Sequence, residues 1–348
     1  MRALDSGLIN QYSTVFCNGV YNYFKDYHPK CTRHGHSGNI DVVTAIKWSC
    51  NIFFYDVGRR LTSDVYDAYA YKLGLGQRTG VEVSEATGRL PPKNDSNYTA
   101  SLDVQAAIGQ GNTVVTPIQL ATYAATLANN GVRYRTHFVK AILDTNTGEV
   151  LSETQPEVMD VIEGTGNTFE LVREGMKQVP STISGKISSY PIAIACKTGT
   201  PQRSETYAPG KHYLNAMMVA YLPADDPEIA IGISIEYGGY GARAGDLVVD
   251  IANAYFAMKD GTLEKQAEEE AAQSQADQQS TGTANGTQTT TGTANTAGTA
   301  GPSGPAQPTQ TEPAAQPATT ETELPAAEPD TEDNPDAIAP ETVPQETG

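Results

Sequence analysis

The first 260 residues predict a mixed α/β fold built from helices packed on an antiparallel sheet. Three observations support this class. Apolar residues repeat at helical spacing from Asp41 onward, three strand-like apolar runs follow one another after residue 190, and an amphipathic helix closes the pattern. Helices that precede an antiparallel sheet and a terminal helix are typical of layered α/β folds. All Trp, Tyr and Phe residues lie at or before Phe256, so we expect the core to end near that residue.

Residues 10–116 alternate irregular and helical patterns. Residues 10–39 are rich in Tyr and irregular, and they hold two cysteines. A helical pattern then begins at Asp41, and its apolar positions are Val42, Ile46, Phe53 and Val57. Glycine and proline punctuate residues 73–92, which predicts a loop with short extended pieces.

The clearest local signal is the helix expected after Thr116. Thr116 can cap the helix, Pro117 suits its first turn, and Asn129-Asn130-Gly131 is a typical end. Residues 109–111, Gly-Gln-Gly, come just before it, and we interpret them as structural residues that turn the chain.

The second half predicts the sheet. Residues 137–153 read as a β-hairpin whose turn lies at 144–148, and residues 165–179 suit an amphipathic helix. Three strands are expected at 192–200, 216–222 and 229–236, followed by the closing helix at 245–258. Cys196 and Lys197 should face opposite sides of the first of these strands, so core packing is expected for Cys196.

Residues 261–348 differ sharply in composition from the rest of the chain. They form an acidic tail rich in Thr, Pro, Ala and Gln, with only Leu263, Leu324, Ile338 and Val343 as large aliphatic side chains. Such a segment cannot bury enough apolar surface to offset its ordering entropy, so we expect a folded domain at 1–260 and a disordered tail at 261–348. The formal net charge of −18 belongs mostly to this tail and disfavours nucleic acid as a partner.

The amino-terminal residues show neither a signal peptide nor an apolar run of transmembrane length. "MRALDSGLIN" instead looks like the second half of an amphipathic helix without a cap, so we expect the chain to begin within an element.

Two short polar motifs point to chemistry. Ser49-Cys50-Asn51 is an S-x-N triplet within the helical pattern, and Lys197-Thr198-Gly199 is a K-T-G triplet near the end of a late strand. Either triplet alone is weak: K-T-G is expected by chance in roughly one chain in ten of this length, and a second S-x-N begins at Ser37. Their order along the chain, with a hairpin and a helix after K-T-G, is more specific.

These motifs and their flanks resemble class B penicillin-binding proteins, the monofunctional peptidoglycan D,D-transpeptidases. "AIKWSCNIFFYDVG" resembles their second motif, "KTGTPQ" their third, "IGQGNTVVTPIQLA" their Gly-Gln-Gly segment, and "ALDSGLI" the stretch after their first motif. The resemblance covers nearly all of residues 1–258. It implies the penicillin-recognising serine acyltransferase fold, an antiparallel sheet flanked by helices with an additional all-helical subdomain.

The resemblance implies serine acyl transfer at D-Ala-D-Ala stem peptides, with β-lactams as inhibitors. It assigns a proton relay to Ser49, a hydrogen bond to the substrate's amide carbonyl to Asn51, and a positive field for the substrate carboxylate to Lys197. It also implies membrane proteins of cell-wall synthesis as partners and a location on the extracytoplasmic face of the plasma membrane. No cofactor is implied.

Substrate binding is expected along the K-T-G strand. By resemblance, Thr198 and Thr200 hydrogen-bond the substrate carboxylate, and the backbone N–H of Thr200 is half of an oxyanion hole. Gly199 lets a substrate peptide approach the strand edge and pair with it.

The first motif of the family, S-x-x-K, carries the nucleophilic serine. No serine of this sequence has a lysine three positions later. We therefore expect the chain to be amino-terminally incomplete, with the nucleophile encoded upstream of Met1, and expect residues 1–348 alone to form no acyl-enzyme.

Two other function classes stay open at this point. One is a non-catalytic penicillin-binding relative that acts as a scaffold, and the other is a β-lactam hydrolase or sensor of the same superfamily. No E-x-x-L-N pattern with a deacylating glutamate is present, which disfavours the hydrolase.

The cysteines and histidines of residues 17–50 invite a zinc site. The candidate ligands are Cys17, Cys31, His34, His36 and Cys50. Their spacing matches no compact C-x-x-C ligand pair, so free thiols or a Cys17–Cys31 disulfide are preferred, and no metal is assigned.

Overall fold

The computed structural model describes residues 1–31, 36–90, 99–262 and 265. Residues 1–260 fall within one compact unit. The tail predicted to lack structure lies almost entirely outside the described residues, and its boundary at 260/261 therefore stays a prediction.

The centre of this unit is a three-stranded antiparallel sheet. Its strands are β7 (Ala195–Gly199), β10 (Ala216–Leu222) and β11 (Ile229–Ile235), in the order β11-β10-β7. The three predicted strands are confirmed. The first, β7, spans Ala195–Gly199 and is therefore shorter than the predicted strand at 192–200. Since β10 is central, β7 lies at one edge of the sheet within the described part of the chain.

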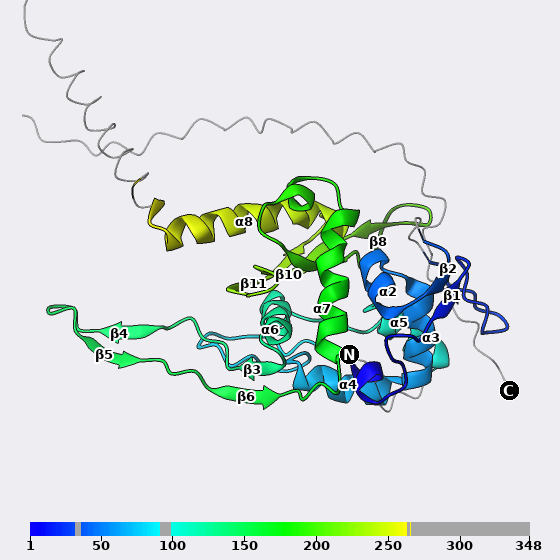
Figure 1. Cartoon of the computed structure of the whole chain (residues 1–348), viewed down its shortest axis with the longest axis horizontal. Helices are drawn as coiled ribbons and strands as arrows, with labels where there is room; N and C mark the ends of the chain where they lie inside the picture. The colour runs from blue at the N-terminus through cyan, green and yellow to red at the C-terminus, as the bar shows by residue number, and fades with distance from the viewer. Residues whose placement is uncertain (32–35, 91–98, 263–264, 266–348) are drawn as a thin grey trace, which may run out of the picture. The chain divides into compact units, whose positions relative to one another are not determined.

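Helices cover both faces of this sheet (Figure 1). On one face lies α8 (Ala244–Lys259), the predicted closing helix. On the other lies α6 (Pro117–Ala128), which begins with the expected cap: the Thr116 hydroxyl and the Gln119 side chain form a capping box. The backbone of α6 lies very close to β11. A Cβ on Gly232 of β11 would lie only 2.6 Å from the backbone nitrogen of Ala121, so the position requires glycine.

The helical pattern that begins at Asp41 divides into two helices. Asp41 caps α2 (Val42–Trp48) by accepting a hydrogen bond from the Thr44 N–H at 2.7 Å, and α3 (Asn51–Leu61) follows after Ser49 and Cys50. The expected continuous helix is therefore interrupted at the S-x-N triplet. Periodicity alone does not show the break, because Phe53 and Val57 still fall on a buried face.

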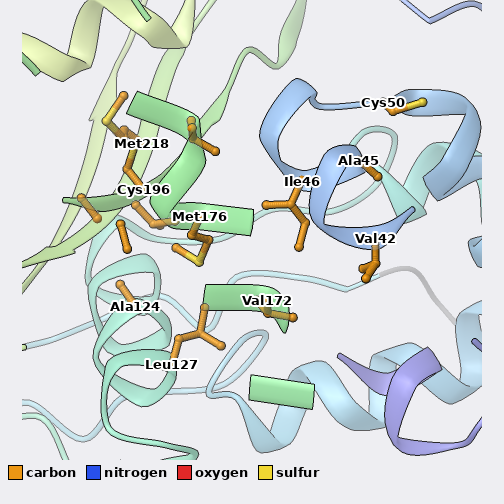
Figure 2. Close-up of a cluster of buried hydrophobic side chains, with 14 of the residues drawn as sticks. Val42, Ala45, Ile46, Cys50, Ala124, Leu127, Val172, Met176, Cys196 and Met218 are labelled. Atoms are coloured by element: carbon orange, nitrogen blue, oxygen red, sulfur yellow. The ribbon is translucent and has the colours of Figure 1, made fainter. Parts of the chain in front are cut away.

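A further helix, α7 (Thr168–Gln178), links α2 to the sheet. Figure 2 shows Met176 of α7 between Ile46 of α2 and Cys196 of β7. Gly175 allows the contact with α2, since a Cβ there would lie 2.7 Å from the Ile46 side chain. Apolar packing through α7 thus sets the distance between the helix that precedes Ser49 and the strand that carries Lys197.

The other elements surround this frame. In chain order they are α1 (Arg2–Asp5), β1 (Val15–Cys17), β2 (Gly38–Ile40), α4 (Ser63–Lys72), α5 (Ala100–Ala107), β3 (Val132–Tyr134), β4 (Ala141–Leu143), β5 (Val150–Glu153), β6 (Val158–Val161), the 3₁₀ turns η1 (Val179–Thr182), η2 (Lys186–Ser189) and η3 (Gly241–Arg243), β8 (Gln202–Ala208) and β9 (Lys211–Leu214). The helices α4 and α5 pack on α3 and form a helical group, and neither is evident from apolar periodicity. Within the described residues, no helix is long and apolar enough to cross a membrane.

The predicted hairpin at 137–153 is present as β4 and β5. Its turn is closed as expected, because the Asp144 carboxylate accepts hydrogen bonds from the N–H groups of Asn146 and Thr147 at 2.8 Å each. Figure 1 shows the hairpin extending away from the sheet and its helices. The large apolar side chains of both strands, Ile142, Leu143, Val150 and Leu151, are exposed.

The amino-terminal helix is tied to residues far along the chain through Asp5. Its carboxylate accepts hydrogen bonds from the Tyr69 hydroxyl at 2.6 Å and from the Thr165 N–H at 3.0 Å. Burial alone would raise the pKa of Asp5, but the hydrogen bonds from Tyr69, Thr168 and Thr165 together hold that pKa below its usual value.

We expect Asp5→Asn to lower the free energy of unfolding by about 1 kcal/mol at pH 7, because the carboxylate is a charged acceptor in a partly exposed site. A lowered folded-state pKa stabilises the fold above the unfolded pKa, and this stabilisation is lost as pH falls through the folded pKa. Urea unfolding at several pH values should therefore show that the difference in the free energy of unfolding between the unchanged chain and Asp5→Asn becomes smaller at acidic pH. A constant difference would contradict the assignment; Glu153→Gln, on the exposed strand β5, is the control.

Candidate active site

Ser49 lies at the break between α2 and α3 in a left-handed backbone conformation. Ser49 has a φ of 53° and a ψ of 48° and is the residue at which α2 ends. Its N–H donates a hydrogen bond to the carbonyl of Ile46, and the N–H of Cys50 donates one to the carbonyl of Ala45. A residue other than glycine adopts this conformation at a small energetic cost, of about 1 kcal/mol. The break therefore presents the hydroxyl at a helix terminus instead of along a helix face.

Lys197 reaches this hydroxyl from the sheet. Its Nζ donates a hydrogen bond to Ser49 Oγ at 2.5 Å, and these two residues are 148 positions apart in the sequence. Nζ also donates to the carbonyl of Thr198 at 3.0 Å. Since the ammonium occupies an acceptor site of the hydroxyl, the Ser49 O–H proton must point elsewhere. The side chains of Ser49 and Lys197, from two elements far apart in sequence, are therefore in direct contact.

Cys196, the neighbour of Lys197, takes the expected core position. It is fully buried, and this burial raises the pKa of its thiol to about 12. The alternation of β7 thus buries Cys196 and leaves Lys197 half-buried on the opposite side.

Asn51 is the first residue of α3, and its side chain is turned toward the Tyr-rich segment. Its Nδ2 donates to the carbonyl of Lys30 at 3.2 Å, and the Tyr55 hydroxyl lies 3.4 Å from the same oxygen. The sequence places Asn51 near Ser49, but this contact with residue 30 follows only from the tertiary structure.

The expected substrate-binding residues line the edge strand. Thr198 and Gly199 pair with Met218 and Met217 of β10, which leaves the other edge of β7 without a strand among the described residues. The Thr200 hydroxyl accepts a hydrogen bond from the Gly241 N–H at 3.0 Å. Thr200 therefore anchors the loop that follows β11.

Sequence reasoning missed this loop after β11 and the hairpin β8–β9. Tyr237 adopts a φ of 55°, its N–H donates to Asn215 Oδ1 at 3.0 Å, and the Arg203 guanidinium lies 4.4 Å from the centre of its ring. The Gly-Gly-Tyr-Gly run at 238–241 was the available sequence signal for a tight loop. In the structure, Gly241 packs directly on the backbone of Gly199, where a side chain would not fit.

The Gly-Gln-Gly segment fits the structural role expected of it. Gly109 and Gly111 have φ values of 75° and 73°, and they turn the chain between α5 and the helix capped by Thr116.

A second cluster lies next to the S-x-N triplet. Sγ of Cys17, Cys31 and Cys50 and a ring nitrogen of His36 all lie within 4.8 Å of one another. All four cysteines of the chain are buried free thiols, and His34 lies outside the described residues. Burial raises the pKa of the Cys17 thiol, and a hydrogen bond with Cys31 followed by burial raises that of Cys50. Three sulfur atoms and an imidazole nitrogen at these distances are side chains of the kind that bind a metal ion.

Comparison with known proteins places this geometry in a family. The model of the penicillin binding protein transpeptidase domain matches residues 1–257. Penicillin-binding protein 2A of Bacillus subtilis is 30% identical over 305 residues, which cover 76% of this chain and 41% of that protein. Peptidoglycan D,D-transpeptidase MrdA of Acinetobacter baumannii is 29% identical over 269 residues, covering 71% of this chain and 39% of that protein.

The similarity extends to solved structures. Pseudomonas aeruginosa PBP2, in complex with WCK 5153, superposes with a TM-score of 0.62 at 28% identity over 73% of this chain and 58% of that chain. Penicillin-binding protein 2B of Streptococcus pneumoniae has the same fold at 22% identity, with a TM-score of 0.62 over 73% and 45%. The chain spans about two fifths of the length of the curated relatives it matches. It belongs to the penicillin-binding protein transpeptidase family.

Proposed function

We propose that residues 1–260 supply the second and third motifs of a class B peptidoglycan D,D-transpeptidase that acts on D-Ala-D-Ala stem peptides. The observation that carries this proposal is the contact of Lys197 Nζ with Ser49 Oγ at 2.5 Å, formed between two elements far apart in sequence. The serine relays protons, and the ammonium supplies the positive field that both the hydroxyl network and a substrate carboxylate require.

The proposed reaction has two steps. A serine hydroxyl of an S-x-x-K motif attacks the carbonyl of the penultimate D-Ala, the peptide C–N bond breaks, and the terminal D-Ala leaves with the proton relayed through Ser49. The amine of a second stem peptide then attacks the ester, loses a proton, and releases the serine as the new amide forms. None of the serines of residues 1–348 begins an S-x-x-K motif.

Substrate binding is proposed along the edge of β7 that pairs with no other described strand. A stem peptide adds there as an extended strand, with Gly199 allowing its backbone to approach. Thr198 and Thr200 bind its carboxylate, the Thr200 N–H faces the oxyanion, and Asn51 binds the amide carbonyl after leaving Lys30.

The cellular setting is part of the same proposal. MrdA-type relatives are named as peptidoglycan transpeptidases, and a Helicobacter pylori PBP2 was solved in complex with MreC. We place this protein on the extracytoplasmic face of the bacterial plasma membrane, with β-lactams as inhibitors and membrane proteins of cell-wall synthesis as partners.

The test is covalent labelling by a fluorescent penicillin. Residues 1–348 alone should give no denaturation-resistant label. The same chain preceded by a segment that carries S-x-x-K, called the extended chain below, should be labelled stoichiometrically. Changing the serine of that S-x-x-K motif to alanine is the control and should abolish the label. Labelling of residues 1–348 that Ser49→Ala blocks would show that Ser49 is itself the nucleophile and overturn the assigned roles.

A further inference from the structure

We propose that Arg203 is a positioning residue of the active site: its side chain clamps the loop after β11, residues 236–241, against the K-T-G strand. Arg203 is the second residue of β8 and lies three positions after Thr200. Its role in acylation rests on the function proposed above, whereas the clamp itself can be tested without any activity.

The loop after β11 contains a backbone conformation that needs support from other elements. Tyr237 has a φ of 55°, in the left-handed region that a bulky side chain seldom adopts. Such a conformation persists only where the surrounding contacts hold it in place. The residues that make those contacts therefore determine the course of the loop.

Backbone hydrogen bonds tie the loop to the end of the β8–β9 hairpin. The Tyr237 N–H donates to Asn215 Oδ1 at 3.0 Å, and the Gly239 N–H donates to the Leu214 carbonyl at 3.1 Å. Leu214 is the last residue of β9, and Asn215 follows it. The hairpin and the loop are thus joined at the left-handed residue.

Arg203 holds the side chain of Tyr237 from the hairpin. Its guanidinium carbon lies 4.4 Å from the centre of the Tyr237 ring, and the Tyr213 ring meets the same ring edge-to-face, with centroids 5.2 Å apart. A guanidinium over an aromatic ring gains a cation–π attraction, which grows where water is partly excluded. The Arg203 side chain is only 23% exposed, so the Tyr237 ring is fixed between a cation and a second aromatic side chain.

Two carboxylates from different elements orient the guanidinium. Glu205 of β8 accepts hydrogen bonds from Nε at 3.0 Å and from Nη2 at 3.2 Å, and the carboxylate of Glu236, the residue after β11, lies 3.8 Å from Nη1. An exposed ion pair alone stabilises a protein little. The bidentate contact with Glu205, however, sets the plane of the guanidinium, and the contact with Glu236 joins β8 to the loop through one cation.

The clamped loop ends on the K-T-G strand. The Gly241 N–H donates to Thr200 Oγ1 at 3.0 Å, and a Cβ on Gly241 would lie 2.2 Å from the carbonyl oxygen of Gly199. A movement of residues 236–241 therefore displaces groups at the edge where substrate binding is proposed. Arg203 acts on these groups through Tyr237 and the loop, which makes its role one of positioning.

The first measurement is amide hydrogen exchange of residues 1–348, which requires no acylation. Arg203→Met keeps an apolar stem but removes the cation, so the hydrogen-bonded N–H groups of residues 236–241 should exchange about tenfold faster, and those of β10 should not. Arg135→Met is the matched control, because it removes another arginine with a carboxylate partner, Glu157 at 3.3 Å, and should leave exchange in the loop unchanged. Unchanged exchange in Arg203→Met would overturn the clamp.

The second measurement separates positioning from a purely structural role. In the extended chain, fluorescent penicillin labelling at several concentrations gives the concentration for half-maximal rate and the limiting rate. Arg203→Met should raise the half-maximal concentration about tenfold and leave the limiting rate nearly unchanged, because a displaced loop weakens binding of the β-lactam carboxylate at Thr200. Arg203→Lys should not restore binding, since an ammonium lacks the planar fork, whereas Tyr237→Phe keeps the ring and should bind normally.

A double substitution tests whether Arg203 acts through Tyr237. Tyr237→Gly removes the ring and suits the left-handed backbone, so adding Arg203→Met should change labelling no further. Additive effects, or a normal half-maximal concentration in Arg203→Met despite faster exchange, would overturn the positioning role. If the unchanged extended chain is not labelled, the proposed function fails, and hydrogen exchange still decides whether Arg203 clamps the loop.

Discussion

Replacing Lys197 by alanine is expected to slow acylation of the extended chain by a β-lactam by about 10²- to 10⁴-fold. The ammonium is the cation in direct contact with Ser49, at 2.5 Å, so its loss removes both the donor that orients the hydroxyl and the positive field for the β-lactam carboxylate. The rate is measured from the time course of fluorescent penicillin labelling. Stability should change little, because Lys197 is only half-buried at a sheet edge.

A matched lysine separates this effect from a general loss of charge. Lys186 forms an exposed ion pair with Asp250 at 2.9 Å, and Lys186→Ala should leave the labelling rate unchanged. Lys197→Arg tests geometry, because the planar guanidinium cannot reproduce the point contact of an ammonium and should recover only part of the rate. Normal labelling of Lys197→Ala would remove Lys197 from the acylation machinery.

Gly241→Ala is expected to lower the free energy of unfolding of residues 1–348 by about 3 kcal/mol, through overpacking against backbone. A Cβ at this position would lie 2.2 Å from the carbonyl oxygen of Gly199 and 2.9 Å from that of Met217. Neither oxygen can move freely, since both belong to the paired strands β7 and β10. The strand that carries the K-T-G motif must therefore shift, and the hydrogen bond from Gly241 to Thr200 is strained with it.

Urea unfolding of the unmodified chain and the variant measures this cost. Ala242→Ser changes the exposed neighbour and should be close to neutral. A Gly241→Ala protein with unchanged stability would mean that the contact between the loop and β7 is looser than the structure shows. In the extended chain, the same substitution should also reduce labelling, because it displaces Thr200.

The sequence itself determined most of the elements of this protein, because their signals are local. The cap at Thr116 and Pro117, the turn at Asp144–Gly148 and the strands of the sheet each depend on residues that lie within a few positions of one another. The short helices α4 and α5 and the exposed hairpin β8–β9 were not evident, because their apolar residues do not follow a clear period. The motif order also identified Ser49 and Lys197 as residues to examine.

Only the tertiary structure decided how these residues meet. The packing of α7 between α2 and β7 sets the contact of Lys197 with Ser49, and the left-handed break at Ser49 frees its hydroxyl from the helix. Spacing along the chain argued against a zinc site, since no two cysteines are close in sequence. Backbone pairing of β1 with β2 and the closure of the loop from Cys17 to Cys31 nevertheless bring Sγ of Cys17, Cys31 and Cys50 and a ring nitrogen of His36 within 4.8 Å of one another. A ligand set drawn from three separate segments has no local signature, because its distances are fixed by contacts between elements and not by their order along the chain.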